Sequence, residues 1–339
     1  MAGRAGDVTR SARATRTIAA VAIRIRSWSN GQLVESTDVD QLGRLVAAKG
    51  SRTWIDLANP APDLVAAVGR RLGLHPLVVE DISEKNERAK VELVGEVIHI
   101  VAFVLDRKVE VTAREVDFVL GPDFVLSVHP ADWDPMAVHQ LKGGAGPLLE
   151  HGPDHLLWAL VDAIVDGYFP VFDVLEDEID TIQDRVLGQP DKTTIQDVFR
   201  LRRELIRMRH IVAPSREMFA QLTSREFSLI SAENAFFFRD VYDHLIRLNE
   251  ELDLLRELVA GSIEIYLSTI NNNLSRIMKR LTGVTVVIAG IGAVGGIFGM
   301  SEAAGALAGN AGPGFYLIVA TTIVASVTGV FLLRRIDWL

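Results

Sequence analysis

Two long apolar runs near the C-terminus constrain this chain more than any other feature. Residues 281–300 are 20 residues without a charged side chain, and residues 315–333 are 19 more. A helix needs about 20 consecutive apolar residues to cross the hydrocarbon core of a bilayer, and soluble helices rarely contain such runs. A short turn-prone segment, EAAGALAGNAGPG, separates the two runs. The pattern predicts a transmembrane helical hairpin.

The first run also contains the pattern G-x-G-x-x-G, at Gly290, Gly292 and Gly295. This pattern binds a dinucleotide only between a strand and a helix, with an acidic residue about 20 positions later for the ribose. The only carboxylates after Gly295 are Glu302 and Asp337, and the chain ends 44 residues after Gly295, too soon to complete a doubly wound sheet. The glycines therefore indicate close backbone approach and not phosphate binding.

Basic residues predict the orientation of the hairpin. Lys279 and Arg280 precede the first run, Arg334 and Arg335 follow the second, and the connecting segment contains neither Lys nor Arg. The positive-inside rule then places both termini in the cytoplasm. We expect a multi-pass protein of the cell membrane, meaning the inner or plasma membrane.

The remaining sequence divides into a compact α/β part and a part made of long helices. The first part alternates β-branched, strand-like segments with segments of helical spacing. In the second part we expect one helix over about 154–187, another from Thr193, and a third from near Asn234 that continues without a proline into the first run. The fold class is α+β, with an N-terminal cytoplasmic α/β domain, a long helical stalk and a C-terminal two-helix transmembrane hairpin. The predicted boundaries are 1–18 for a disordered tail, 19–150 for the α/β domain, 151–280 for the long-helix bundle and stalk, 281–300 for the first span, 301–314 for the extracytoplasmic loop, 315–333 for the second span and 334–339 for a cytoplasmic tail.

The third helix carries a stripe of small, weakly polar residues, broken only by a methionine. Its members step by three and four and are Ser275, Met278, Thr282, Thr285, Ala289, Gly292, Gly296 and Gly299. Several copies of such a helix can line a narrow axial pore with this stripe. The same spacing also suits close helix packing, through Gly292/Gly296 and Gly295/Gly299. Spacing alone leaves both interpretations open.

Charge and composition exclude several classes of function. The net charge of −9 argues against nucleic acid as a partner, and the absence of cysteine excludes disulfides and cysteine-ligated zinc. Eight carboxylates and no basic residue lie between Asp162 and Asp184. They form either a solvated helix face or an acidic surface that concentrates cations. No H-E-x-x-H or G-x-S-x-G motif occurs, so we expect no enzyme activity and no cofactor.

Several segments together resemble the CorA family of divalent-cation transporters. They are GLHPLVVEDI, LVDAIVDGYF, FFRDVYDH, LRELVAGSIEIYLSTINNNLSRIMKRLT, GIFGM and the terminal WL. The resemblance covers nearly the whole chain in the right order. It implies a homopentameric funnel in the lipid membrane, with a pore-lining first span and an outer second span. It also implies passive transport of Mg²⁺, with Co²⁺, Ni²⁺ or Zn²⁺ as further substrates and Mg²⁺ as a regulatory ligand.

The resemblance assigns roles to particular residues. Met278 and Leu281 match a hydrophobic gate. Pore-facing positions fall on Ser275, Gly292 and Gly296, and the stripe adds Thr285 and Ala289. Regulatory carboxylates at subunit interfaces match Asp81 with Asp240, and Glu80 with Asp162 as a second site.

One departure concerns the outer mouth of the pore. The family signature there is Gly-Met-Asn, and this chain has Gly299, Met300 and Ser301. Mg²⁺ holds its first-shell waters tightly, and a ring of Asn carbonyls can accept hydrogen bonds from them. A serine hydroxyl also accepts but is shorter, so we expect a wider site, and the sequence leaves its preferred ion open. The alternative function is a non-conducting, membrane-anchored metal sensor or scaffold with the same fold.

Overall fold

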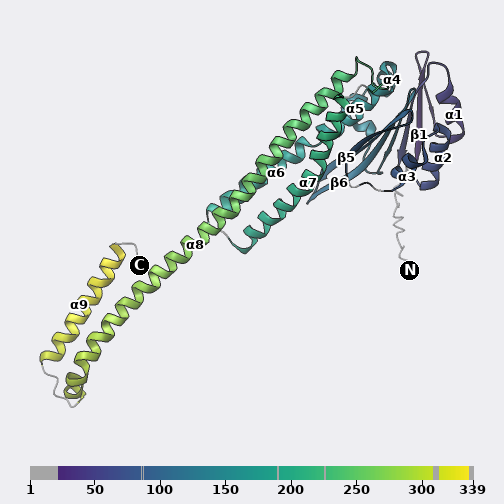
Figure 1. Ribbon diagram of the computed structural model, residues 1–339. Coiled ribbons are helices and arrows are strands. Elements are labelled where there is room, and N and C mark those ends of the chain that lie inside the picture. The colour runs from purple at the N-terminus through teal and green to yellow at the C-terminus, as the bar shows by residue number, and fades with distance from the viewer. Residues whose placement is uncertain are drawn as a thin grey trace, which may run out of the picture. The chain divides into compact units, whose positions relative to one another are not determined.

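The computed structural model describes most of the chain (Figure 1). The described residues are 22–84, 86, 88–188, 191–224, 227–307 and 313–335. The tail expected over 1–18, residues 308–312 of the expected loop and the final residues 336–339 lie outside the described residues. The chain divides into two compact units. The first is Met1–Glu178 with Leu201–Arg256, and the second is Ile179–Arg200 with Glu257–Leu339.

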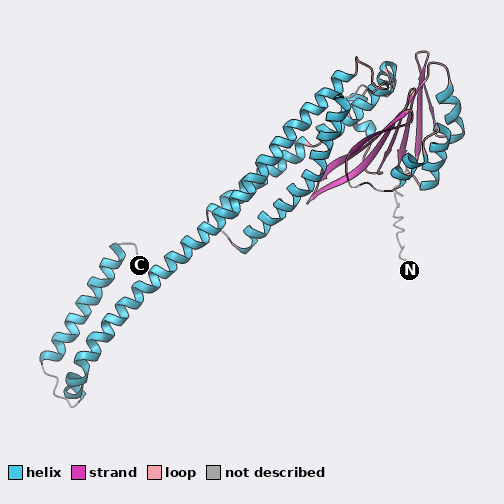
Figure 2. Cartoon of the chain, viewed as in Figure 1, coloured by secondary structure: helices cyan, strands magenta, loops and turns pink. Residues whose placement is uncertain are grey.

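The first unit contains a seven-stranded sheet of order β2-β1-β3-β7-β6-β5-β4 (Figure 2). β3 and β7 are parallel, and the other neighbours pair antiparallel. The predicted mixture of strands and helices in this part of the chain is confirmed, and the short strands β2 and β4 form the two edges of the sheet. The strands are β1 (Ile23–Ser29), β2 (Gln32–Ser36), β3 (Arg52–Ala58), β4 (Lys90–Val94), β5 (Val97–Arg107), β6 (Val111–Leu120) and β7 (Phe124–His129).

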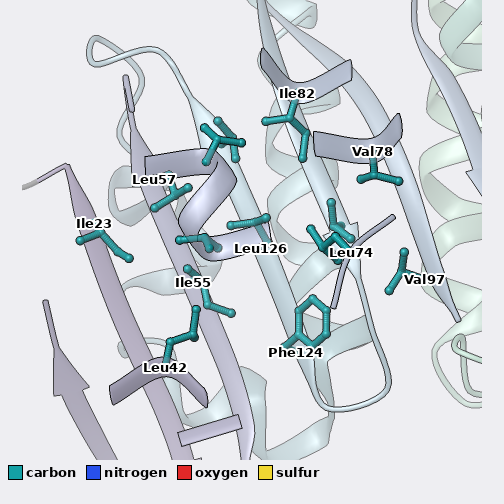
Figure 3. Packing of buried hydrophobic residues seen from close by; sticks show 14 of the residues in the cluster. Ile23, Leu42, Ile55, Leu57, Leu74, Val78, Ile82, Val97, Phe124 and Leu126 are labelled. Atoms are coloured by element: carbon teal, nitrogen blue, oxygen red, sulfur yellow. The ribbon is translucent and has the colours of Figure 1, made fainter. Parts of the chain in front are cut away.

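Helices α1–α3 cover one face of this sheet, and α5 lies against strands of the first unit as well. Leu42 of α1 and Val78 of α3 pack among Ile55 and Leu126 of the central strands (Figure 3). Full burial of one such side chain contributes about 1.5–3 kcal/mol. The helices are α1 (Val39–Ala47), α2 (Pro62–Leu72), α3 (Pro76–Ser83), α4 (Gly146–His151), α5 (Pro153–Asp166), α6 (Phe169–Leu187), α7 (Lys192–Ser224), α8 (Ala235–Leu307) and α9 (Pro313–Arg335), with 3₁₀ turns at Pro135–Ala137 and His139–Leu141.

The single helix expected over about 154–187 is two helices, α5 and α6, and that prediction was wrong. Pro170 has no N–H to donate to the carbonyl of Asp166, so it interrupts the helical ladder at this point. Tyr168, at the junction, is buried, and its hydroxyl donates a hydrogen bond of 2.5 Å to the Phe103 carbonyl of β5. This hydrogen bond attaches the junction between α5 and α6 to the sheet.

Helix α8 is 73 residues long and begins where the sequence predicts. Its leucine repeat, with Leu245, Leu248 and Leu252, is buried, as the three-four spacing indicates. The helix ends at Leu307, so residues 301–307, which we expected in the loop, are helical. Alanine-rich sequence favours helix, and no proline occurs before Pro313.

Asp154 on α5 holds the segment that leads into α8. Its buried carboxylate accepts hydrogen bonds from the Ser231 backbone N–H (2.9 Å), the Ser231 hydroxyl (2.9 Å) and the Asn234 side-chain amide (2.8 Å). Asn234 immediately precedes α8, and Ser231 lies one turn earlier. One carboxylate therefore sets where α8 starts relative to α5.

We predict that Asp154→Ala destabilises the protein by about 2–4 kcal/mol, because the buried Asn234 amide and the two Ser231 donors lose their acceptor. The measurement is denaturant unfolding of the purified full chain. Asp63→Ala, on the exposed first turn of α2, is the matched control and should change stability by less than about 1 kcal/mol. Equal effects of the two substitutions would show that the Asp154 network does not anchor α8.

Candidate functional site

The small-residue stripe of α8 is exposed in the single chain. Ser275, Thr285, Ala289, Gly292 and Gly296 are all exposed. Nothing lies within 4 Å of a Cβ built at Gly292 or Gly296. The stripe therefore does not pack against the described residues of its own chain.

The two expected gate residues lie on the same open surface. Met278 is 53% exposed and Leu281 is 59% exposed. The Thr285 hydroxyl donates to the Leu281 carbonyl one turn earlier, at 2.8 Å. This bond satisfies the donor and leaves the hydroxyl oxygen able to accept from a water.

Helix α9 lies against the side of α8 that is opposite the small-residue stripe. A groove of about 410 Å³ between them is lined on α8 by positions that include Val287, Gly290 and Val294. At about 100° per residue, Val287 and Val294 point roughly opposite to Thr285 and Gly292. The stripe and the α9 contact are thus separate faces of one helix.

The outer-mouth motif lies on the last turns of α8. The backbone at Gly299, Met300 and Ser301 is helical. Their side chains lie outside the described residues, so their role in ion selection stays a prediction. Upstream, within Ala235–Gly296, α8 contains a helical stretch that is long and apolar enough to cross a bilayer, and 6% of that stretch is buried.

A first group of potential metal ligands joins α5 to α8. Ligand atoms of Asp162, Asp240 and His244 all lie within 4.8 Å of one another. His244 Nδ1 is 3.4 Å from an Asp166 carboxylate oxygen, and Gln140 donates to Asp162 at 2.8 Å. Burial, and then the Asp166 charge, raise the pKa of Asp162 to about 6. An oxygen-binding divalent metal at this position would offset the like charges of Asp162 and Asp166.

A second group joins α3 to the sheet. Ligand atoms of Asp81, Glu92 and His99 also lie within 4.8 Å of one another. Glu92 and His99 are directly opposite each other in the β4–β5 ladder. His99 is buried, and its Nε2 is 3.0 Å from an Asp117 carboxylate oxygen. Lys90 contacts both Asp81 and Glu92.

Within one chain these groups differ from the pairs that the resemblance implies. The structure brings Asp162 and Asp240 together, whereas Asp81 lies with Glu92 and His99, and Glu80 is exposed and belongs to neither group. Sequence reasoning missed Glu92, His99 and His244 as group members. The i, i+4 spacing of Asp240 and His244 was a usable signal, but the approach of Glu92 and His99 depends on strand register.

The acidic segment after Asp162 is largely a solvated face. Asp166, Asp173, Glu176 and Asp180 are exposed. Two of these carboxylates affect a residue of α8. Burial, and then the charges of Glu176 and Asp173, raises the pKa of Glu251. Asp162 is the exception, with 7% of its surface exposed.

The long apolar helix and the grouped ligand atoms fit a class of membrane-associated protein that binds divalent cations. A profile of the CorA-like Mg²⁺ transporter protein family matches residues 49–335. The chain therefore belongs to the CorA family, whose members are divalent-cation transporters and not enzymes.

Individual relatives agree with this assignment. The chain is 33% identical over 256 residues to the cobalt/magnesium transport protein CorA of Thermotoga maritima, covering 74% of this chain and 73% of that protein. It is 24% identical over 289 residues to the protein of the same name from Methanocaldococcus jannaschii, covering 84% of this chain and 91% of that protein. The complete structure of the CorA magnesium transporter from M. jannaschii matches with a TM-score of 0.77 at 22% identity, over 94% of this chain and 98% of that chain. This last likeness establishes the fold.

Proposed function

We propose that several copies of this chain form a channel in the cell membrane that conducts hydrated divalent cations, with Mg²⁺ and Co²⁺ as the first substrates to test. The observation that carries the proposal is the open stripe of α8, which faces away from α9. A helix whose small, weakly polar side is left unpacked in one chain is suited to face an aqueous axis in an assembly. A 33% identical relative is named a cobalt/magnesium transport protein.

The proposed pore combines two physical elements. Small residues such as Gly292 and Gly296 leave room for a cation that keeps its tightly held waters. Met278 and Leu281, about one turn apart, form a constriction that closes by excluding water. We propose a homopentamer with α9 as the outer span, both termini in the cytoplasm and Ser301 as a ring of short hydroxyl acceptors at the outer mouth. No ATP is needed, because the membrane potential drives cations inward.

The cytoplasmic carboxylates are the proposed sensor of internal metal. Asp240 and Asp162 offer oxygen ligands, and the Asp81 and Glu80 carboxylates of a neighbouring copy complete the sites in the assembly. Mg²⁺ usually binds proteins through one or two carboxylates and keeps several waters. Without metal, facing carboxylates repel one another, so loss of metal loosens the closed state.

A matched pair of glycine substitutions tests the pore. Gly292→Leu places a bulky side chain on the stripe and should reduce divalent-cation flux at least about tenfold. An increase of about 1.4 kcal/mol in the barrier to cation passage corresponds to a tenfold reduction. Gly290→Leu, on the α9 side where nothing lies within 4 Å of an added Cβ, should retain most of the flux. The measurement is Mg²⁺ and Co²⁺ uptake into proteoliposomes with a negative internal potential and no ATP.

Two outcomes would contradict the proposal in different ways. Equal flux for the two glycine variants means that the stripe does not line the path. A folded, assembled wild-type protein that passes no divalent cation supports the alternative, a non-conducting metal sensor or scaffold.

The sensor is tested by Asp240→Asn and Asp81→Asn. Each variant should stay folded and conduct cations that internal Mg²⁺ no longer inhibits, because the metal loses a charged ligand. Wild-type protein should be digested by protease faster in a chelator than in millimolar Mg²⁺, and this difference should shrink in both variants. Asp243→Asn, exposed on the same helix, is the control and should behave as wild type. Wild-type inhibition and protection in both variants would place the sensor elsewhere.

A further inference from the structure

The ammonium group of Lys90 lies where a bound cation would be expected. Lys90 Nζ is 2.6 Å from Asp81 Oδ2 and 3.3 Å from Glu92 Oε2. Lys90 and Glu92 are two positions apart on β4, so both side chains leave the same face of the strand. Asp81 approaches them from the last turn of α3. Two carboxylates from different elements thus share one ammonium.

The surroundings favour a cation at this position. Asp117, whose carboxylate oxygen lies 3.0 Å from His99 Nε2, is a third acidic side chain beside this group. The Lys90 side chain is 28% exposed and forms ion pairs with both carboxylates, and the ordinary pKa of lysine is about 10.4. Lys90 therefore remains charged at neutral pH. Its single positive charge offsets part of the negative charge of the two carboxylates that it contacts.

We propose that Lys90 is a tethered counter-cation that competes with divalent metal for the Asp81 carboxylate and so sets the metal concentration at which the channel closes. The proposal rests on the regulatory role proposed above for Asp81. A divalent ion that binds Asp81 must displace the ammonium or share the carboxylate with it, and a nearby positive charge weakens its binding in both cases.

An opposite effect is expected if Lys90 only holds Asp81 in place. Removal of Lys90 would then leave the carboxylate mobile, and metal would bind more weakly. The direction of the change in metal affinity therefore separates competition from positioning.

The experiment measures the Mg²⁺ concentration that gives half-maximal protection of the full-length protein against protease, and half-maximal inhibition of flux in proteoliposomes. Lys90→Gln should lower both midpoints about two- to fivefold, which is the range for loss of one partly exposed ion pair. Lys90→Met, which keeps an unbranched side chain without the charge, should do the same. Lys90→Arg keeps the charge and should stay near the wild-type midpoint. Lys49→Gln, an exposed lysine elsewhere on the α/β domain, is the matched control.

Each result has one meaning. Lower midpoints in the two neutral variants, with wild-type midpoints for Lys90→Arg and Lys49→Gln, support the competition. Unchanged or higher midpoints in the neutral variants overturn it, while Mg²⁺ protection of the wild type leaves the proposed sensor intact. No protection of the wild type by Mg²⁺ overturns the sensor and the competition together.

Discussion

Carboxylates held close together repel unless a cation lies between them, and much of this chain is arranged around that constraint. Two unit charges 4 Å apart interact by about 1 kcal/mol in water and about 4 kcal/mol near a protein surface. Burial, and then the Asp166 charge, raises the pKa of Asp162 to about 6, and Gln140 donates a hydrogen bond to it. Asp81 meets the constraint with the Lys90 ammonium. A carboxylate that a nearby cation stabilises can also respond to the binding or loss of a metal ion.

Helix α8 carries both parts of the proposed mechanism on one continuous backbone. Asp240 and His244 lie near its start, and the open stripe lies further along the same helix. The Asp154 network fixes that start to α5, which itself bears Asp162. Metal at the carboxylates would therefore act directly on the helix that we propose lines the pore. No separate signalling element is required.

Local patterns in the sequence were enough for much of the fold. Runs of about 20 apolar residues predict the long C-terminal helices, and the buried run of β5 is continuous enough to read as a strand. The break between α5 and α6 was missed although Pro170 signals it locally. The extension of α8 to Leu307 was missed because its glycines and alanines were read as a turn.

The metal-ligand groups were less predictable than the elements. The resemblance supplied Asp81 and Asp240, and Asp162 with Glu80. The neighbours Lys90, Glu92 and His99 come together only through the β4–β5 register and the placement of α3. The spacing of these residues along the chain does not indicate that they lie together, so a search for sequence patterns would not have found the group.

The central claim is that the small-residue face of α8 lines a cation path, and the absence of cysteine from the chain allows a direct test. Single cysteines at Thr285 and Ala289 lie on the stripe, and single cysteines at Val287 and Val294 lie on the face toward α9. The measurement is block of Mg²⁺ flux by a water-soluble thiol reagent in proteoliposomes. The account predicts strong block at Thr285→Cys and Ala289→Cys and little at Val287→Cys and Val294→Cys. Equal block on both faces, or block only on the α9 face, would contradict it.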